Sequence, residues 1–129
     1  MREIKFKGYY KTTDDEIKYK IFTLSDIHSG MIEDYDEVVQ YTGLKDKNGV
    51  EIYEGDIVDV AYGEGKIRCR VVYCIDFASF IMIPTDDIKI KSLCFDIGLS
   101  DRIKVIGNIY ENPELIETTL KEMEWVTWY

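Results

Sequence analysis

The stretch that most narrows the possible fold is KIRCRVVYCID, residues Lys66 to Asp76, in which apolar side chains recur at every second position. Side chains of a β-strand point alternately to opposite faces, so this pattern predicts a long strand with one buried face. A glycine-rich turn, Gly63-Glu64-Gly65, directly precedes it and favours an antiparallel partner strand over residues 57–61. The residues expected on the buried face are Ile67, Cys69, Val71, Tyr73 and Ile75.

Shorter alternating runs on both sides of this strand extend the β pattern. Residues 2–9 and 16–24 alternate around a polar turn at 12–15, which predicts an N-terminal hairpin with half-buried strands. Residues 25–37 are polar and acidic, and they predict a short helix or an irregular loop. In the first strand, Ile4 and Phe6 would share one face, and Glu3, Lys5 and Lys7 the other. In the second strand, Ile17, Tyr19 and Ile21 would share one face, and Lys18 and Lys20 the other. Further strands are expected over residues 79–83, 88–93 and 103–110.

The stretch QYTGLKDKNGVEIYEGDIV, residues Gln40 to Val58, contains tight turns and no residue placed for chemistry. Asp46-Lys47-Asn48-Gly49 predicts a turn, because Asn and Gly tolerate the positive φ that hairpin turns require. Glu54-Gly55-Asp56 predicts a second turn, and Tyr53 and Ile57 are expected in the core. We therefore interpret this stretch as a determinant of folding, in which Gly43, Gly49 and Gly55 supply backbone conformations that other residues resist.

The C-terminal part of the chain predicts a helix. Asn112 suits the N-cap position, Pro113 the first helical position, and Glu114 the positive end of the helix dipole. The chain then ends in an aromatic segment that would either cover the protein's own barrel or contact a neighbouring copy. The apolar stripe of the helix would hold Leu115, Ile116, Leu120 and Met123, and the aromatic segment holds Trp125, Trp128 and Tyr129.

These elements predict a mainly β fold in a single domain, residues 1–129. The expected layout is an N-terminal hairpin within residues 1–37, a small SH3-like, barrel-like core within residues 38–110, and a C-terminal α-helix and tail within residues 111–129. The SH3-like expectation rests on the order of glycine turn, long strand, bend and strand. Such a likeness of layout carries no function.

Composition and charge limit the classes of function. The chain carries 16 basic and 25 acidic residues, a net charge of −9, and an acidic protein is repelled at long range by nucleic acid and anionic membranes. It has no apolar run long enough to span a bilayer and no signal-peptide core, so a cytoplasmic protein without a membrane partner is expected. Three cysteines without a CxxC pattern indicate neither a disulfide framework nor a thiolate zinc site, and no cofactor is expected.

Two separated signatures carry a family resemblance. QYTGLKDKNGVEIYEGDIV, with VIGNIYENPELI at residues 105–116 and the opening REIKFKGY, resembles the YopX-like proteins of phages and prophages. The resemblance implies a mostly β protein of a bacterial host, from a family without an assigned activity, so it brings no catalytic residues. The matching residues, which we expect to be structural, are Tyr41, Thr42, Gly43, Asp46, Gly49, Tyr53, Gly55, Asp56, Gly107, Asn108, Asn112 and Pro113.

No group of residues predicts an enzyme. His28 is the only histidine, and the acidic residues around it favour a solvated loop over a metal site, which would recruit several His or Cys ligands. Cys69 is expected to be a buried small hydrophobe. Cys74 shares a strand face with Arg68 and Arg70, which would favour its thiolate and make it the most reactive of the thiols. A catalytic base for Cys74 would have to come from the distant His28.

Basic side chains offer an alternative surface. Lys66, Arg68 and Arg70 would share one face of the long strand, and small barrels bind single-stranded nucleic acid through such faces. The other interpretation is that these are ordinary solvent-facing positions paired with acidic residues. Similar basic pairs are Lys89 with Lys91 and Arg102 with Lys104, and the acidic partners considered are Asp87, Asp76 and Glu64.

The leading functional hypothesis is a non-enzymatic phage or prophage accessory protein. It would act through protein–protein contacts with a phage or host protein and would form a homo-oligomer. The hypothesis rests on the lack of a catalytic constellation, the net acidity and the aromatic C-terminal segment. The alternative is a nucleic-acid-binding small barrel that uses Lys66, Arg68 and Arg70, and a third hypothesis is an acidic protein that imitates DNA.

Overall fold

The computed structural model describes residues 3–30, 34–85, 92–95 and 99–116. Within these residues the chain is mainly β, as the alternation predicts, with nine strands, one short α-helix and two 3-10 turns. In chain order the elements are β1 (Lys5–Lys11), β2 (Ile17–Thr23), α1 (Leu24–His28), β3 (Glu37–Lys45), β4 (Glu51–Tyr53), β5 (Asp56–Tyr62), β6 (Gly65–Cys74), β7 (Ser79–Pro84), β8 (Leu93–Cys94), η1 (Leu99–Arg102), β9 (Ile103–Asn108) and η2 (Pro113–Leu115).

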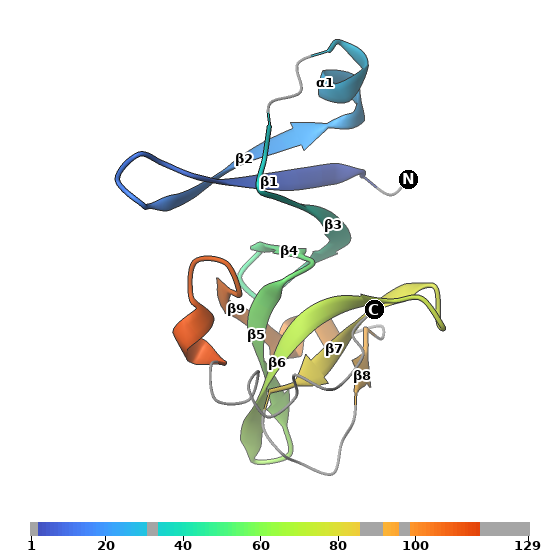
Figure 1. Cartoon of the computed structure of the whole chain (residues 1–129). Helices are drawn as coiled ribbons and strands as arrows, with labels where there is room; N and C mark the ends of the chain where they lie inside the picture. The colour runs from blue at the N-terminus through green and yellow to red at the C-terminus, as the bar shows by residue number, and fades with distance from the viewer. Residues whose placement is uncertain (1–2, 31–33, 86–91, 96–98, 117–129) are drawn as a thin grey trace.

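The strands form two antiparallel sheets. The N-terminal sheet has four strands in the order β2-β1-β3-β4, and the C-terminal sheet has five in the order β8-β7-β6-β5-β9. Figure 1 shows the β1–β2 hairpin and α1 at one end of the molecule and the C-terminal sheet at the other, with β3 and β4 between them. The chain therefore passes from one sheet to the other through the turn between β4 and β5.

The N-terminal hairpin is confirmed, but the inward face of β1 is the one that carries lysines. β1 and β2 pair without a register break. Tyr9 is buried on the inward face, where the Lys7 ammonium lies 4.5 Å from the centroid of the Tyr53 ring. Phe6 lies on the opposite face and stacks on Phe22, with ring centroids 5.4 Å apart. A lysine can face inward here because its stem is apolar and an aromatic ring attracts its ammonium group.

The C-terminal sheet contains the main hydrophobic core and the predicted long strand, β6. The turn at Gly63 joins β5 to β6 with Tyr62 opposite Gly65, as expected from its glycines. Ile75 was wrongly assigned to the buried face: it is 70% exposed, because β6 ends at Cys74 and a turn follows. The buried residues of the core are Ile52, Val58, Val60, Cys69, Val71, Met82 and Ile103.

The opposite face of β6 is partly buried as well. Val72 and Cys74 pack in a second apolar cluster with Ile81 and Ile83 of the neighbouring strand β7. Both faces of β6 are therefore covered near the β6–β7 turn. The outer face of β6 is polar only at its other end, where Lys66, Arg68 and Arg70 lie.

The structure differs from the predicted layout in one place, and it leaves most of the predicted C-terminal helix untested. β3 and β4, expected within the barrel-like core, instead pair in the sheet of the N-terminal hairpin, where β3 lies against β1. Of the C-terminal helix, the described residues contain only the 3-10 turn η2; the rest of that prediction, and most of the strand expected over 88–93, lies outside them. The SH3-like barrel stays a prediction. In the described part of the chain, no helix is both long and apolar enough to cross a membrane.

Candidate functional site

The two signature stretches meet in space at Asp46. This side chain is only 5% exposed, and its Oδ1 accepts hydrogen bonds from the N–H groups of Asn48 at 2.8 Å and Val50 at 2.9 Å. Its Oδ2 accepts a third from the N–H of Val105 in β9, at 2.9 Å. Burial opposes ionisation, but these hydrogen bonds outweigh it and hold the pKa of Asp46 below its usual value. Asp46 therefore ties the β3–β4 turn to the C-terminal sheet.

Gly55 makes the second connection between the signatures. It turns the chain from β4 into β5 with φ +88°, and its N–H donates to the carbonyl of Val71 at 2.8 Å. Its own carbonyl accepts from the N–H of Ile109 at 2.9 Å. A Cβ at this position would lie 2.9 Å from Cε2 of Tyr110, a distance that side-chain carbons do not normally reach. Glycine is therefore required here both for its φ and for the space it leaves to Tyr110.

The second signature closes on itself just after β9. Oδ1 of Asn108 accepts hydrogen bonds from two backbone N–H groups of the following turn, at 3.1 and 2.8 Å. Asn112 Oδ1 accepts from the N–H of Asn108 at 3.2 Å, so its side chain binds backward along the chain and does not cap η2, which begins at Pro113. A Cβ at Gly107 would lie 2.6 Å from Asn112 Oδ1. These contacts favour the structural interpretation of the signature.

β3 carries a bulge where it pairs with β4. The register shifts between Tyr41 and Lys45, and within this interval Thr42 Oγ1 donates to the carbonyl of Ile52 at 2.7 Å. On either side of the bulge the strands still pair, with the Tyr41 and Tyr53 rings 5.3 Å apart. The predicted left-handed backbone is confirmed at Gly43, Gly49 and Gly55, whose φ angles are +88°, +81° and +88°.

Tyrosine side chains fill the region between the two sheets, which we call the joint. Tyr9, Tyr41, Tyr53 and Tyr110 form one apolar cluster, in which the Tyr9 and Tyr110 ring centroids are 4.5 Å apart. Burial raises the pKa of Tyr9 and Tyr53, and raises that of Tyr110 to about 12. The Tyr9 hydroxyl is buried and has no hydrogen-bond partner among the described residues. The rings are therefore neutral packing groups at physiological pH.

Asp56 is the most perturbed carboxyl of this joint. It is 2% exposed, and its Oδ2 accepts a hydrogen bond from the N–H of Tyr53 at 2.8 Å. Burial raises its pKa to about 7, although that hydrogen bond and the charge of Lys7 lower it. Such a pKa suits an acid–base catalyst, but a carboxyl this deeply enclosed offers no surface to a substrate.

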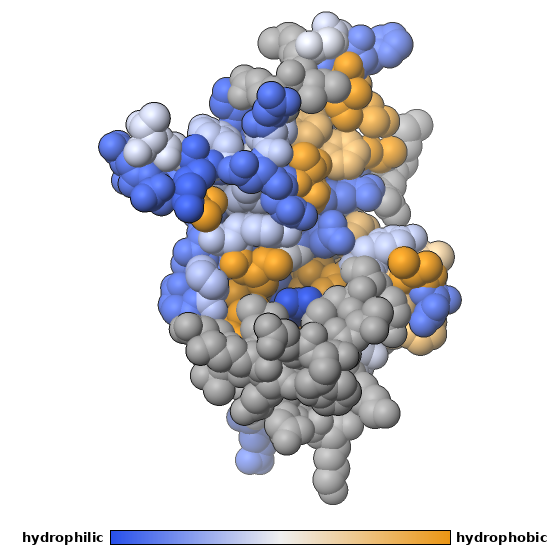
Figure 2. Space-filling view, viewed as in Figure 1, coloured by the Kyte–Doolittle hydropathy of each residue, from blue (hydrophilic) through white to orange (hydrophobic). Residues whose placement is uncertain are grey.

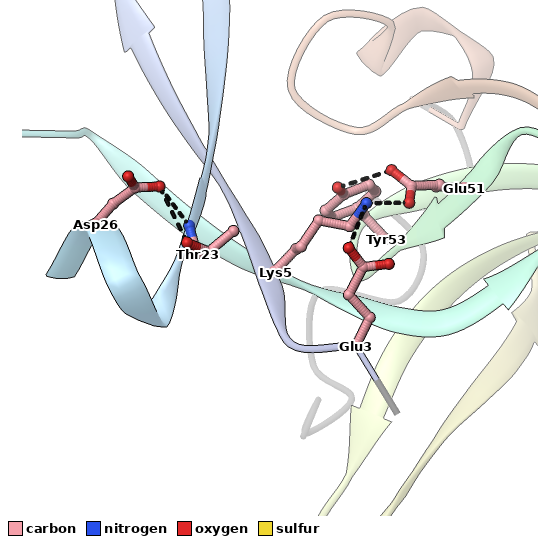
Figure 3. A network of polar contacts seen from close by, with 6 residues as sticks. All are labelled: Glu3, Lys5, Thr23, Asp26, Glu51 and Tyr53. Carbon is pink, nitrogen blue, oxygen red and sulfur yellow. Dashed lines mark hydrogen bonds and ion pairs between the residues drawn. The ribbon is translucent and has the colours of Figure 1, made fainter. Parts of the chain in front are cut away.

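Lys5 connects β1 to β4 at the edge of the same joint, as Figure 3 shows. Its Nζ pairs with Glu51 and, at 3.4 Å, with Glu3, and it lies 5.1 Å from the centroid of the Tyr41 ring. The hydrogen bond to Glu51 is the main cause of a raised Lys5 pKa. Tyr53 Oη donates to the other oxygen of Glu51 at 3.3 Å. The network is built for attachment of the two strands.

The basic residues of β6 lie on one face, as predicted, but Asp59 of β5 lies among them. It pairs with Lys66 at 3.3 Å and with Arg68 at 3.4 Å, whereas the sequence pointed to other acidic partners. Lys104 of β9 is opposite Asp59 in the strand ladder. Burial lowers the pKa of Arg70. Among the described residues, the outer face of the C-terminal sheet is thus basic and partly neutralised by the Asp59 carboxylate.

The remaining candidate residues do not assemble into a reactive centre. His28 is exposed in α1, and within the described ranges no group of three or more His, Cys, Asp or Glu residues lies close enough to hold a metal ion. Cys69 is buried, as predicted. The choice of Cys74 as the most reactive thiol was wrong, because it is 1% exposed in an apolar cluster, whereas Cys94 is exposed. Trp125, Trp128 and Tyr129 lie outside the described residues.

The N-terminal sheet exposes a set of apolar side chains that the sequence pattern did not lead us to expect. Ile17, Tyr19 and Ile21, here called the β2 row, share one face of β2 and are 37%, 44% and 48% exposed. The adjoining α1 exposes Leu24 and Ile27, which line a shallow hollow on its surface. Figure 2 shows hydrophobic surface over this end of the molecule. Tyr19 of this row contacts the Tyr9 ring, with ring centroids 5.8 Å apart, and the Lys7 ammonium, which is 4.4 Å from the Tyr19 ring centroid. Alternation identified a row of apolar residues, but it could not show that the row stays this exposed.

The helix that follows the β2 row is held in place at its start. Thr23 donates to Asp26 Oδ2 through its N–H at 2.8 Å and through its hydroxyl at 3.2 Å (Figure 3). This capping arrangement fixes the direction in which α1 leaves β2. The short helix is one of the two structures expected for residues 25–37.

A family model described as YopX protein matches residues 2–117, a range that includes both signature stretches. The chain belongs to the YopX family. A crystal structure of protein EF1440 from Enterococcus faecalis is similar to this YopX protein at 22% identity and a TM-score of 0.53, covering 90% of this chain and 99% of that chain. A likeness at this identity shows a shared fold. Comparison with curated proteins finds no match.

Proposed function

We propose that this YopX protein is a phage-type accessory protein without enzymatic activity, which associates with a second copy of itself through β2. The observation that carries the proposal is the β2 row, Ile17, Tyr19 and Ile21, exposed on the outermost strand of the N-terminal sheet. Exposed apolar groups in contiguous arrangement mark interaction surfaces, and an edge strand also presents backbone groups to a partner.

The signature residues support the proposal because their side chains and backbone are already engaged in contacts within the protein. Asp46, Gly55 and Asn108 are engaged in backbone contacts of the joint, and the tyrosines around them are packed against one another. A buried joint of this kind holds the N-terminal sheet in a defined position relative to the C-terminal sheet. Contacts with a partner are then expected on exposed surfaces such as β2.

The proposal is tested by light scattering of the purified protein and of the variant Ile17→Thr/Tyr19→Thr/Ile21→Thr. Threonine retains strand propensity, so the variant removes apolar surface without a change of local structure preference. The matched control is Ile75→Thr/Phe77→Thr, which alters two apolar residues, 70% and 66% exposed, at the far β6–β7 turn. We expect a dimer for the wild type and the control and a monomer for the β2 variant. A β2 variant with the wild-type mass would overturn the proposal.

A second candidate function is nucleic-acid binding by the outer face of the C-terminal sheet. It is favoured by Arg68, Arg70 and Lys104, which outnumber the carboxylate of Asp59 among the described residues of that face. Fluorescence anisotropy with labelled single-stranded DNA at two salt concentrations tests it. Binding that weakens steeply with salt, and that Arg68→Glu/Arg70→Glu abolishes, would support this function over the first.

A further inference from the structure

We infer that the turn after β9, residues 109–111, here called the strap, is a proton-dependent closure of the joint: it lies closed while Asp56 is protonated and loosens when Asp56 ionises. The strap follows the C-terminal sheet and meets the chain where it passes from β4 to β5 (Figure 1). This device concerns how firmly the two sheets hold each other. It is independent of the proposed self-association through β2.

The strap is held in place by contacts on both sides of the joint. The N–H of Ile109 donates to the Gly55 carbonyl at 2.9 Å. The Tyr110 ring lies so close over Gly55 that an added Cβ would be 2.9 Å from its Cε2. The centroid of the same ring is 4.5 Å from that of Tyr9, in β1. The strap therefore contacts the β4–β5 turn and the N-terminal sheet at once.

Asp56 directly follows Gly55 and is buried with little support for a charge. Asp46 provides the comparison, because it is buried to a similar extent but accepts three backbone N–H groups, which keep its pKa low. Among the described residues, Asp56 accepts one hydrogen bond, from the N–H of Tyr53 at 2.8 Å. Its surroundings therefore favour the neutral carboxyl, and burial raises its pKa to about 7.

The charged groups that face Asp56 include one on the strap itself. Lys7 of β1 favours ionisation of Asp56, whereas Glu111 of the strap and Asp46 of the β3–β4 turn oppose it. The Tyr9 hydroxyl of β1 is also close enough to respond, since its pKa is raised mainly by burial and next by the charge of Asp56. Loss of the proton from Asp56 thus places like charges on the strap and on the turn that it covers.

The same turn carries a second carboxyl that favours the proton. Burial raises the pKa of Glu54, a backbone hydrogen bond from Gln40 lowers it, and the charge of Glu37 in β3 raises it. Both carboxylates also act on the Tyr110 ring of the strap, whose pKa is raised first by burial and then by Glu37 and Glu54. Negative charge therefore collects around the strap when the acidic groups of the joint ionise.

Ionisation of Asp56 is accommodated when water reaches its carboxylate, because a buried and poorly paired charge is far less stable than a hydrated one. The strap covers the turn, so release of the hydrogen bond between Ile109 and Gly55 opens this route. The pKa of Asp56 is about 7 when the strap is closed and about 4 when the carboxyl is hydrated. The strap is therefore held most firmly below about pH 4, and its hold weakens as the pH rises to about 7.

The test is amide hydrogen exchange of Ile109, followed by NMR at pH 5.5 and pH 8. Opening of the strap releases this N–H, so its protection factor, corrected for the intrinsic exchange rate, reports the ratio of closed to open strap. We expect the factor to be about thirtyfold lower at pH 8 and insensitive to low urea concentrations, since a local opening exposes little surface. Equal protection at the two pH values, or exchange through urea-sensitive global unfolding alone, would overturn the inference.

Three variants assign the pH dependence to the strap. Asp56→Asn does not titrate, so protection of Ile109 should be the same at both pH values. Glu111→Gln removes the like charge of the strap and should give a smaller fall than the wild type. The matched control is Glu114→Gln, which neutralises an exposed carboxyl in η2 and should keep the wild-type fall.

A wild-type fall in Asp56→Asn would attribute the effect to other groups and overturn the inference. The comparison of Glu111→Gln with Glu114→Gln decides the matter when Asp56→Asn does not fold. Equal falls in these two variants would show that the charge of the strap plays no part, which also contradicts the inference.

Discussion

Asp46 in the β3–β4 turn accepts a hydrogen bond from the backbone N–H of Val105, 59 positions later in the chain, at 2.9 Å. The same carboxyl accepts two further N–H groups of its own turn. One side chain thus fixes a local turn and its attachment to β9, and so links the two signature stretches of this chain.

Replacement of this carboxyl is expected to be costly. Asp46→Ala removes a buried, charged acceptor of three backbone hydrogen bonds, and we expect a loss of about 3 kcal/mol in the free energy of unfolding. Urea denaturation measures it. The control, Asp101→Ala, removes an exposed carboxyl near the same strand and should change stability by less than about 0.5 kcal/mol. Similar losses in the two variants would show that Asp46 does not clamp the joint.

Two glycines separate the cost of backbone strain from the cost of a clash. Gly49 and Gly55 have φ angles of +81° and +88°, but only Gly55 has a neighbour, Tyr110, where a Cβ would be placed. We expect Gly49→Ala to lose about 1 kcal/mol of stability and Gly55→Ala about 3 kcal/mol, since the second adds steric overlap to the strain. Thermal and urea unfolding provide both numbers. Equal losses would argue against the close packing of Tyr110.

Asp56 makes the stability of the protein depend on pH in an unusual direction. Its pKa of about 7 in the folded chain lies above the ordinary value of about 4, so the folded state holds an extra proton between these values. Its contribution to stability is complete below about pH 4 and is lost as the pH rises through about 7. From pH 5.5 to pH 8 we expect a loss of about 2 kcal/mol from this group.

The matched variant for this prediction is Asp56→Asn. Its amide oxygen can still accept the hydrogen bond from Tyr53, but the side chain does not titrate. The free energy of unfolding of the variant, measured by urea denaturation at both pH values, should lack the loss seen in the wild type. A slope unchanged by the substitution would assign the pH dependence to other groups.

The Tyr9 hydroxyl offers a stabilising substitution. It is buried without a hydrogen-bond partner among the described residues, and a buried polar group in that state costs free energy. We expect Tyr9→Phe to raise the free energy of unfolding by up to about 1 kcal/mol. Tyr53→Phe is the comparison, since it breaks the hydrogen bond to Glu51 and should lower stability by about 1 kcal/mol. Destabilisation by Tyr9→Phe would mean that its hydroxyl has a partner in solution.

The sequence pattern was sufficient to predict those elements whose stability depends on neighbouring residues. The alternation of residues 66–74 and the glycines before them predicted β6 and its turn, because the period of two and a positive φ are properties of a few neighbouring residues. The same holds for the N-terminal hairpin. The match of Asp46 to the family signature was also visible, although its bond to Val105 was not.

The sequence did not predict in the same way which face of each strand is covered by another element. Alternation states which residues share a face, but not which face another element covers. The inward position of Lys7, and the exposure of Tyr19 on that same face, therefore both came as corrections. Ile75 was misplaced, and the burial of Cys74 was missed, for a related reason, since the end of a strand and the packing of a second face depend on the neighbouring strand β7.

The sequence by itself determined the β class and the turns, because both rest on short stretches whose backbone preferences are intrinsic. It also showed membership of the YopX family, since the family model matches residues 2–117. The tertiary structure decided that β3 and β4 join the N-terminal sheet, that the two signatures meet around Asp46 and Gly55, and that the β2 row stays exposed. These are outcomes of long-range packing. They depend on which apolar surfaces find a partner, and a linear pattern carries no record of that competition.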